Sequence, residues 1–120
     1  MKAIFIDAEK RKVEDIEINS AGTCGLDEFY AKIGHGCDMV EAVYFDGDND
    51  KDLLCVDEEG TFRNLDSGFI IGGTLKIVGN GIIVGAGSED FTDTTLTAAQ
   101  IAPKVKFRTI EELAEINGEA

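Results

Sequence analysis

The stretch that decides the fold is Met39–Asp57, MVEAVYFDGDNDKDLLCVD, in which an acidic segment joins two apolar ones. The first apolar segment is rich in Val, Tyr and Phe and is apolar at both alternating positions, which is typical of a strand covered on both faces. Val40, Val43 and Tyr44 would also suit a helix face, but the short length and the aromatic content favour a strand. Residues 47–51 carry the Gly, Asp and Asn that hairpin turns use. We therefore predict a β-hairpin.

Two further elements precede this hairpin. KAIFID at Lys2–Asp7 is rich in β-branched and aromatic residues, AEKRK is a charged turn, and VEDIEIN at Val13–Asn19 supplies a return strand. LDEFYAKIG at Leu26–Gly34 then has apolar residues at intervals of three and four, and its final glycine stands where a left-handed cap ends a helix. The sequence therefore predicts a first hairpin followed by a helix that packs on the sheet.

Short β-rich segments separated by glycines follow the acidic hairpin. GFIIGG, TLKIVGNG and IIVGAG, between residues 68 and 87, are expected to add strands to the same sheet, with GNG as a tight turn between Val78 and Ile82. KVKFR at Lys104–Arg108 is the last strand candidate. The GNGIIVGAG stretch contains neither the dinucleotide-binding nor the Walker pattern of glycines, so we interpret its glycines as turns or bulges.

Two capping-box spacings mark the starts of the remaining helices. Thr97 is followed three residues later by Gln100, and Thr109 by Glu112. The first box predicts one helical turn before Pro103, and the second predicts a terminal helix over residues 109–118. Runs of strands with a few helices indicate the α+β class. We therefore predict one α+β domain over residues 1–120, with a mostly antiparallel sheet built from hairpins and two to three short helices packed on it.

Charge restricts the classes of partner. The chain has 24 acidic and 11 basic residues, which gives a formal net charge of −13. Such a surface repels phosphate backbones, so we expect no direct nucleic-acid binding, and a partner should be a basic protein surface or a cation. The alternative is that the charge only keeps the protein soluble and monomeric. No apolar run is long enough to cross a bilayer, and we expect a cytoplasmic protein with no membrane partner. The sequence leaves the oligomeric state open.

The strongest candidate site is DGDNDKDLLCVDEEG, residues 46–60, which holds seven acidic residues and one lysine. A calcium loop, a nucleic-acid decoy and a solvated turn are the three interpretations. Counted from Asp48, acidic residues occupy the first, third, fifth and twelfth positions of an EF-hand loop, but the sixth, which requires glycine, is Leu53. A solvated acidic turn is favoured over an EF-hand or a looser calcium site. The side chains assigned to the candidate binding hairpin are Asp46, Asp48, Asp50, Asp52, Asp57, Glu58 and Glu59.

The thiols and the single histidine offer a weaker candidate site. Cys24, Cys37 and Cys55 are odd in number and form no Cys-x-x-Cys pair, which predicts thiols in a reducing compartment and argues against disulfides. A zinc site with His35 is an alternative, but the spacing lacks paired ligands, so ordinary core residues are favoured. His35 could also pair with a cysteine or with Ser88 as a nucleophile, yet no catalytic motif surrounds any of them. We therefore expect a protein that is not an enzyme and binds no metal or cofactor.

The order of the segments resembles a family of small uncharacterised proteins encoded mostly by bacteriophages, plasmids and gut bacteria. The segments are MKAIFIDAEKRKVEDIEI, FYAKIGHGCDMVEAV, LLCVDEEGTF, IIGGTLKIVGNGIIVG and LTAAQIAPKVKF, which together span roughly Met1–Phe107. VDEEG at Val56–Gly60, with the glycine-containing strand pair after it, is the clearest shared part. The family has no established activity, so the resemblance transfers no catalytic residue. It implies a mobile-element accessory or anti-defence protein that acts by binding.

These observations predict a small acidic binding protein that engages a basic protein surface. A binder of a small nucleotide-like molecule or of a divalent cation is the alternative, with its site among the glycine-rich strands or at the aspartate-rich tip. The two alternatives differ in whether a ligand alone raises the unfolding midpoint.

Overall fold

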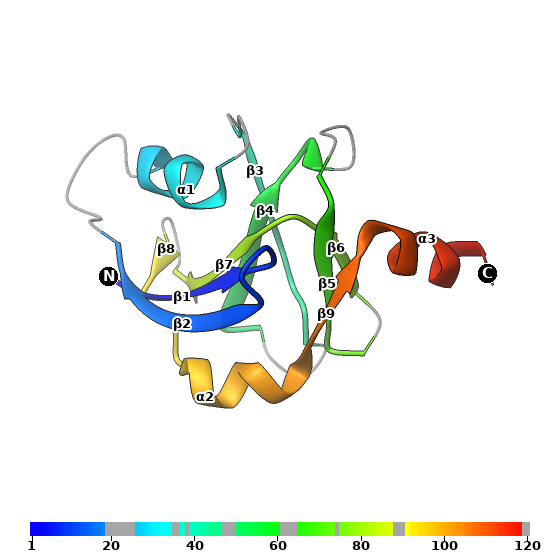
Figure 1. Ribbon diagram of the computed structural model, residues 1–120. Coiled ribbons are helices and arrows are strands. Elements are labelled where there is room, and N and C mark those ends of the chain that lie inside the picture. The colour runs from blue at the N-terminus through cyan, green and yellow to red at the C-terminus, as the bar shows by residue number, and fades with distance from the viewer. Residues whose placement is uncertain are drawn as a thin grey trace.

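The described part of the chain forms two β-sheets, three short α-helices and a 3-10 helix (Figure 1). The computed structural model describes residues 1–18, 26–34, 37, 39–46, 50–60, 65–73, 75–87 and 91–118. In chain order, the elements are β1 (Lys2–Asp7), β2 (Lys12–Glu17), α1 (Leu26–Ile33), β3 (Val40–Val43), β4 (Asp52–Asp57), β5 (Ser67–Ile71), β6 (Leu75–Val78), β7 (Gly81–Ala86), β8 (Phe91–Thr92), α2 (Ala98–Ile101), the 3-10 helix η2 (Ala102–Lys104), β9 (Val105–Thr109) and α3 (Ile110–Gly118). The predicted α+β class is confirmed.

The larger sheet contains both predicted hairpins. Its strand order is β2-β1-β7-β4-β3, and the short β8 pairs with β7. All of its pairings are antiparallel. The first hairpin pairs Lys2 with Glu17, and the second pairs Val40 with Asp57. Both hairpins are therefore confirmed, and β7 is inserted between them from much later in the chain.

The first strand of the acidic hairpin differs from its prediction. β3 is only four residues long and lies at the edge of the sheet, with Glu41 and Ala42 exposed and Val40 half-buried. The expectation that this strand is covered on both faces is wrong. The covered strand is its partner β4, which lies between β3 and β7 and buries Leu54 and Cys55 completely.

The glycine-rich strands are divided between two sheets. β5 and β6 form a separate three-stranded sheet with β9, in the order β6-β5-β9, and β7 joins the larger sheet. The prediction that all of them extend one sheet is therefore wrong. Gly79, with a φ of 87°, lies in the link from β6 to β7. Positive φ costs glycine little, so the GNG segment can lead the chain from one sheet into the other, and β6 pairs with β5 rather than with β7.

The main core contains side chains from both sheets. Ile4 and Ile83 of the larger sheet pack with Phe69 and Ile71 of the smaller one, and Ile101 of α2 closes the same cluster. All five side chains are fully buried. Burying an aliphatic or phenyl side chain stabilises a fold by about 1.5–3 kcal/mol, so this cluster is a main source of the free energy of folding.

Helix α1 covers the opposite face of the larger sheet. Its Phe29 and Ile33 belong to a second buried cluster that includes Phe5 of β1. The helix ends at Gly34, whose φ is 72° and whose N–H donates to the carbonyl of Tyr30 at 2.8 Å. The left-handed cap that the sequence predicts at this glycine is confirmed.

Both predicted capping boxes are present. At the start of α2, the Gln100 N–H donates to Thr97 Oγ1 and the Thr97 N–H donates to Gln100 Oε1. At the start of α3, the Glu112 N–H donates to Thr109 Oγ1 at 3.1 Å and the Thr109 N–H donates to Glu112 Oε1 at 2.9 Å. These reciprocal bonds satisfy N–H groups that a helix start leaves without partners.

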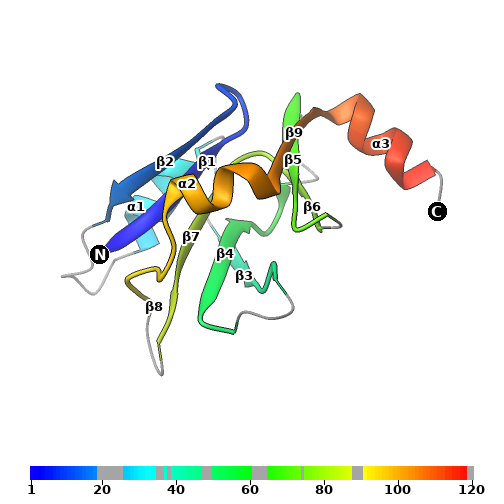
Figure 2. The same ribbon diagram turned by 90° about the horizontal axis from the view of Figure 1, so that it is seen from below.

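Helix α3 projects from one end of the molecule (Figures 1 and 2). Leu113 anchors the described part of this helix, because its side chain is buried. A Cβ added at Gly68 of β5 would lie 2.8 Å from Leu113 Cδ1, so the helix packs closely where β5 has no side chain. Among the described helices, none is both long and apolar enough to span a membrane.

Candidate functional site

The exposed acidic residues of the β3–β4 hairpin lie at the two ends of β4. Asp50 is exposed in the tip before the strand, and Glu58 and Glu59 are exposed in the turn after it. β4 lies between these two groups, and its six residues span about 17 Å from first to last, at about 3.4 Å per residue, so the groups are at least that far apart. This separation exceeds the screening length of about 8 Å at physiological salt, so Asp50 and the pair of glutamates act separately on a partner, and at the tip the exposed Lys51 directly follows Asp50.

Asp46 forms an ion pair with a lysine of the same molecule. Its Oδ2 lies 3.4 Å from Nζ of Lys104, at the end of η2, and both side chains are partly exposed. An exposed ion pair of this kind contributes at most about 1 kcal/mol, so the contact orients Asp46 more than it stabilises the fold. Asp48 lies outside the described residues.

Asp52 is a buried structural residue, so its assignment to the binding side chains of the hairpin is wrong. Its side chain is completely buried. Oδ1 accepts hydrogen bonds from Thr94 Oγ1 at 2.6 Å and from the Thr95 N–H at 2.9 Å, and Oδ2 accepts from Thr95 Oγ1. The carboxylate therefore ties β4 to the segment that leads into α2. An EF-hand loop counted from Asp48 would therefore lack its fifth-position ligand.

The sequence contains a signal for this burial. Side chains alternate between the faces of a strand, so Asp52 shares a face with Leu54 and Val56. Both of those residues belong to the core between the sheets. The alternation within β4 thus indicates an inward carboxylate, although the local excess of acidic residues suggests an exposed turn.

Asp57 is also buried and ends β4. Its Oδ1 accepts the N–H of Glu59 at 2.9 Å, the side-chain-to-backbone bond two residues on that is typical of aspartate in turns. Of the seven acidic residues assigned to the hairpin, the ones described as exposed are therefore Asp50, Glu58 and Glu59.

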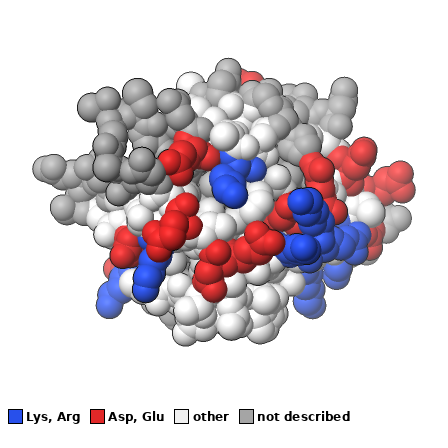
Figure 3. All heavy atoms as spheres, turned by 60° about the vertical axis from the view of Figure 1, so that its left-hand side comes forward, with Lys and Arg blue, Asp and Glu red and all other residues white. Residues whose placement is uncertain are grey.

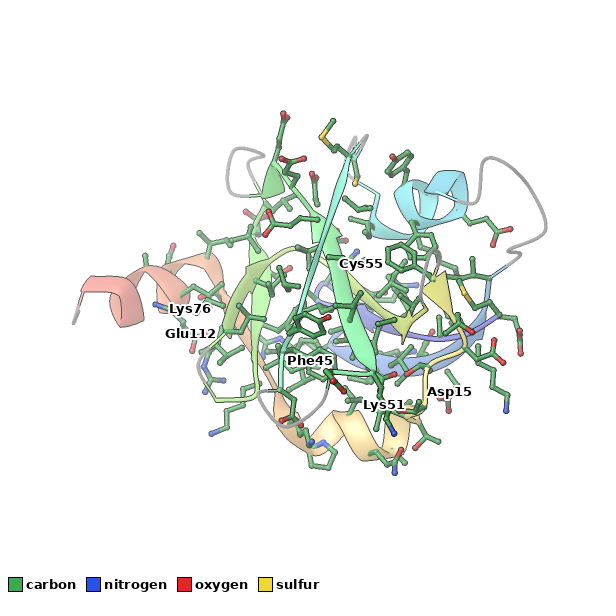
Figure 4. All side chains as sticks on the ribbon, turned by 180° about the vertical axis from the view of Figure 1, so that it is seen from behind. Asp15, Phe45, Lys51, Cys55, Lys76 and Glu112 are labelled. Carbon is green, nitrogen blue, oxygen red and sulfur yellow. The ribbon has the colours of Figure 1, made fainter. Side chains whose placement is uncertain are left out.

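The cysteines are core residues where the structure describes them. Cys37 and Cys55 are buried thiols, as predicted, and Figure 4 shows Cys55 within the larger sheet. Burial raises the pKa of the Cys55 thiol from its ordinary value of 9.0 to about 12. A thiol that does not ionise near neutral pH is a poor nucleophile and a poor metal ligand. Cys24 and His35 lie outside the described residues, and in the rest of the chain no three potential metal ligands come together.

Sequence reasoning missed an exposed apolar feature beside the acidic residues. Met39 and Tyr44, at the two ends of β3, are 54% and 61% exposed and are the exposed large hydrophobic residues of the described chain. Ala42 and Glu41 between them are exposed as well. A glutamate in the middle of an otherwise apolar strand was the available signal, because a strand covered on both faces would bury that charge.

Basic residues lie on another part of the surface. In the smaller sheet, Lys76 and Lys106 pair with Ile70 from either side. The residues next to these lysines along their strands, Ile77 and Val105, face the core, so the lysines lie on the outer face. The pKa of Glu112 is lowered, mainly by the hydrogen bond that its carboxylate accepts from the Thr109 backbone. The positive charges of Arg108, on the same face, and of Arg11 lower it further. Figure 3 shows acidic side chains spread over one side of the molecule and the largest group of Lys and Arg side chains gathered at its edge.

Comparison with known proteins gives one finding. No curated protein and no solved structure matches the chain. The sequence model of one family, described as a domain of unknown function (DUF3846), matches residues 1–109, from β1 to the last residue of β9. Because this match covers every strand of both sheets, the chain belongs to the DUF3846 family of uncharacterised proteins.

Proposed function

We propose that this protein is a small acidic binding protein that occupies a basic surface of another protein and catalyses no reaction. The observation that carries the proposal is the surface of the β3–β4 hairpin, which exposes Met39 and Tyr44 together with the carboxylates of Asp50, Glu58 and Glu59. Protein interfaces commonly combine an apolar contact with a polar rim, and aromatic residues and methionine are enriched in them. The hairpin supplies both parts.

The net charge of −13 supports a basic partner. Charged residues at an exposed rim steer the encounter between two proteins and act mainly on the association rate. The proposal assigns this role to Asp50 at the tip and to Glu58 and Glu59 at the far end of β4, and their exposure supports it.

In a narrower form, we propose that the basic surface is one that otherwise holds nucleic acid, as expected of an accessory or anti-defence protein of a mobile element. A groove that binds phosphates is lined with Lys and Arg, and an acidic protein surface is complementary to such a groove. The support for this form is the net charge together with the resemblance of the sequence segments to mobile-element proteins.

Affinity capture with two matched variants tests the proposal. The hairpin variant carries Asp50→Asn, Glu58→Gln and Glu59→Gln, and the control variant carries Glu14→Gln, Asp66→Asn and Glu111→Gln. Each variant removes three negative charges from exposed positions. We expect immobilised wild-type protein to retain a basic protein from a bacterial lysate at low salt, the control to retain a similar amount, and the hairpin variant to retain several-fold less.

Two results would contradict the proposal. If both variants lost the partner equally, net charge alone would explain capture, and the hairpin would have no special role. If the captured protein were acidic or neutral at its contact surface, the electrostatic basis of the proposal would fail. The narrower form is tested by adding a nucleic acid that the captured protein binds. If both compete for one groove, the nucleic acid must displace the acidic protein from its partner.

A further inference from the structure

We propose that the outer edge of β3 binds an extended basic segment of the partner, which adds one strand to the larger sheet. This inference rests on the proposed function and names how the partner is held. Addition of a strand to an open sheet edge is a common mode of peptide recognition, in which main-chain hydrogen bonds supply affinity and alternate side chains supply specificity.

Within the residues that the structure describes, the edge at β3 is open and has little protection. β3 is the last strand in the order of the larger sheet, and no described strand pairs with its outer side. Proteins usually protect such edges with charged residues or proline. The opposite edge, β2, carries four charged residues in six positions, whereas β3 carries Glu41 alone and no lysine or proline.

Hydrogen-bond alternation shows which backbone groups face the open side. The Glu58 N–H donates to the Met39 carbonyl at 3.0 Å, which makes this a hydrogen-bonded pair of the antiparallel ladder. Such pairs occur at every second residue, so Glu41 and Val43 also bond to β4. The N–H and C=O groups of Val40 and Ala42 then point away from β4, toward the open edge.

The hydrogen bonds on the other side of β4 confirm this assignment of backbone groups. There the Ala86 N–H donates to the Lys51 carbonyl at 2.7 Å, so the odd-numbered residues of β4 direct their backbone groups to β7. Its even-numbered residues must therefore bond to β3. Leu54 and Val56, the partners of Val43 and Glu41, are the even-numbered residues that this requires.

Side chains along the edge define the chemistry of the added strand. Ala42 is exposed on one face of β3 and Glu41 on the other, and the exposed ring of Tyr44 directly follows the strand, so Ala42 and Tyr44 offer exposed apolar surface. A strand laid beside them would place alternate residues against the apolar pair and against the carboxylate. Asp50 and Glu58 add negative charge near the two ends of the hairpin. The occupant that fits is a segment in which apolar and basic residues alternate.

Ala42→Pro and Ala42→Thr form a matched pair of variants for the test. Because the Ala42 N–H points to the open edge, proline there removes no bond to β4, whereas it takes away a donor that an added strand requires. Threonine keeps the donor and favours a strand. The thermal midpoint of each variant, compared with the wild type, shows whether the fold is retained.

The probe is a labelled synthetic peptide of alternating lysine and valine, long enough to span β3. We expect the wild type and Ala42→Thr to bind it within about twofold of each other, and Ala42→Pro to bind it at least about tenfold more weakly. A peptide of the same composition, with its lysines and valines in two blocks, should bind the wild type weakly. Equal binding of the alternating peptide to all three proteins would overturn the inference.

Amide exchange in the wild type gives a second readout that requires no variant. On addition of the alternating peptide, exchange at Ala42 should slow at least about tenfold, because its N–H gains a partner. Val43, whose N–H already bonds to β4, serves as the internal reference. Peptide binding with unchanged exchange at Ala42 would place the peptide elsewhere and overturn the inference.

Failure of this inference can be distinguished from failure of the proposed function. If the basic protein captured from lysate bound Ala42→Pro as well as it bound the wild type, the acidic surface would act without strand addition. If no basic protein were captured, the proposed function itself would fail. A wild-type dimer that Ala42→Pro converts to a monomer would identify the occupant as a second copy of the chain, which would also overturn the inference.

Discussion

At the scale of single residues, Asp52 shows how an acidic stretch can contain both a surface and a core. Its carboxylate is buried and accepts hydrogen bonds from Thr94 and Thr95, the two threonines before α2. Asp50, two positions earlier, is exposed. The difference follows from the start of β4, since the strand directs Asp52 inward with Leu54, whereas Asp50 stands before it.

We expect Asp52→Asn to lower the free energy of unfolding by about 2 kcal/mol. An amide has one oxygen in place of two, so it cannot accept all the hydrogen bonds that Thr94 and Thr95 donate, and bonds to a charged group are worth about 1.5–3 kcal/mol. Asp50→Asn, the exposed control, should change it by less than about 0.5 kcal/mol. Urea unfolding of both variants measures the difference, and equal stabilities would show that the buried cluster contributes nothing.

Cys55 gives a dependence of stability on pH. Burial raises the pKa of its thiol from 9.0 to about 12, so the folded protein keeps the thiol protonated over a range in which the unfolded chain ionises. A pKa raised by folding contributes stability that is complete below pH 9 and is lost as the pH rises toward 12. Cys55→Ala should show a shallower loss of unfolding free energy over this range than the wild type. Parallel pH profiles would contradict this expectation.

At the scale of elements, the sequence predicts well what depends on neighbouring residues. The Lys2–Asp7 strand, the glycine cap of α1 and both capping boxes are present as predicted, because each depends on residues only a few positions apart. Sheet membership was not predictable in this way. β5 pairs with β9, whose residues come more than thirty positions later, and the local composition of either strand does not indicate that pairing.

The candidate site was predicted in part for the same reason. The hairpin itself follows from its turn residues, and Glu58 and Glu59 are exposed as expected. That β3 lies at an edge, with Met39 and Tyr44 exposed, depends on β7 pairing with β4 instead. The periodicity of side chains along a strand cannot show which of its two hydrogen-bonding edges pairs with another strand.

We expect calcium at millimolar concentration to change the thermal midpoint by less than about 1 °C. The carboxylate of Asp52 is already engaged by Thr94 and Thr95, and the position that an EF-hand loop reserves for glycine is Leu53, inside β4. A ligand that binds only the native state must raise the midpoint. A rise of several degrees that Asp50→Asn abolishes would restore the calcium interpretation of the hairpin.

At the scale of the whole molecule, charge is unevenly distributed. Lys76, Lys106 and Arg108 share the outer face of the smaller sheet, while the β3–β4 hairpin of the larger sheet carries exposed carboxylates at both ends of β4. With a net charge of −13, the molecule repels other acidic proteins, and we propose that its hairpin attracts basic ones. The fold thus supplies an apolar edge strand within a negative field, which is the arrangement that the proposed function requires.

The most direct test is the rate at which the captured basic protein associates with the wild type and with the two charge variants, measured at low and at high salt. We expect Asp50→Asn, Glu58→Gln and Glu59→Gln together to slow association about fivefold at low salt and to reduce its salt dependence, because electrostatic steering is screened by salt. The control with Glu14→Gln, Asp66→Asn and Glu111→Gln should stay within about twofold of the wild type. An unchanged rate and salt dependence in the hairpin variant would show that its carboxylates are only solvated and that the binding surface lies elsewhere.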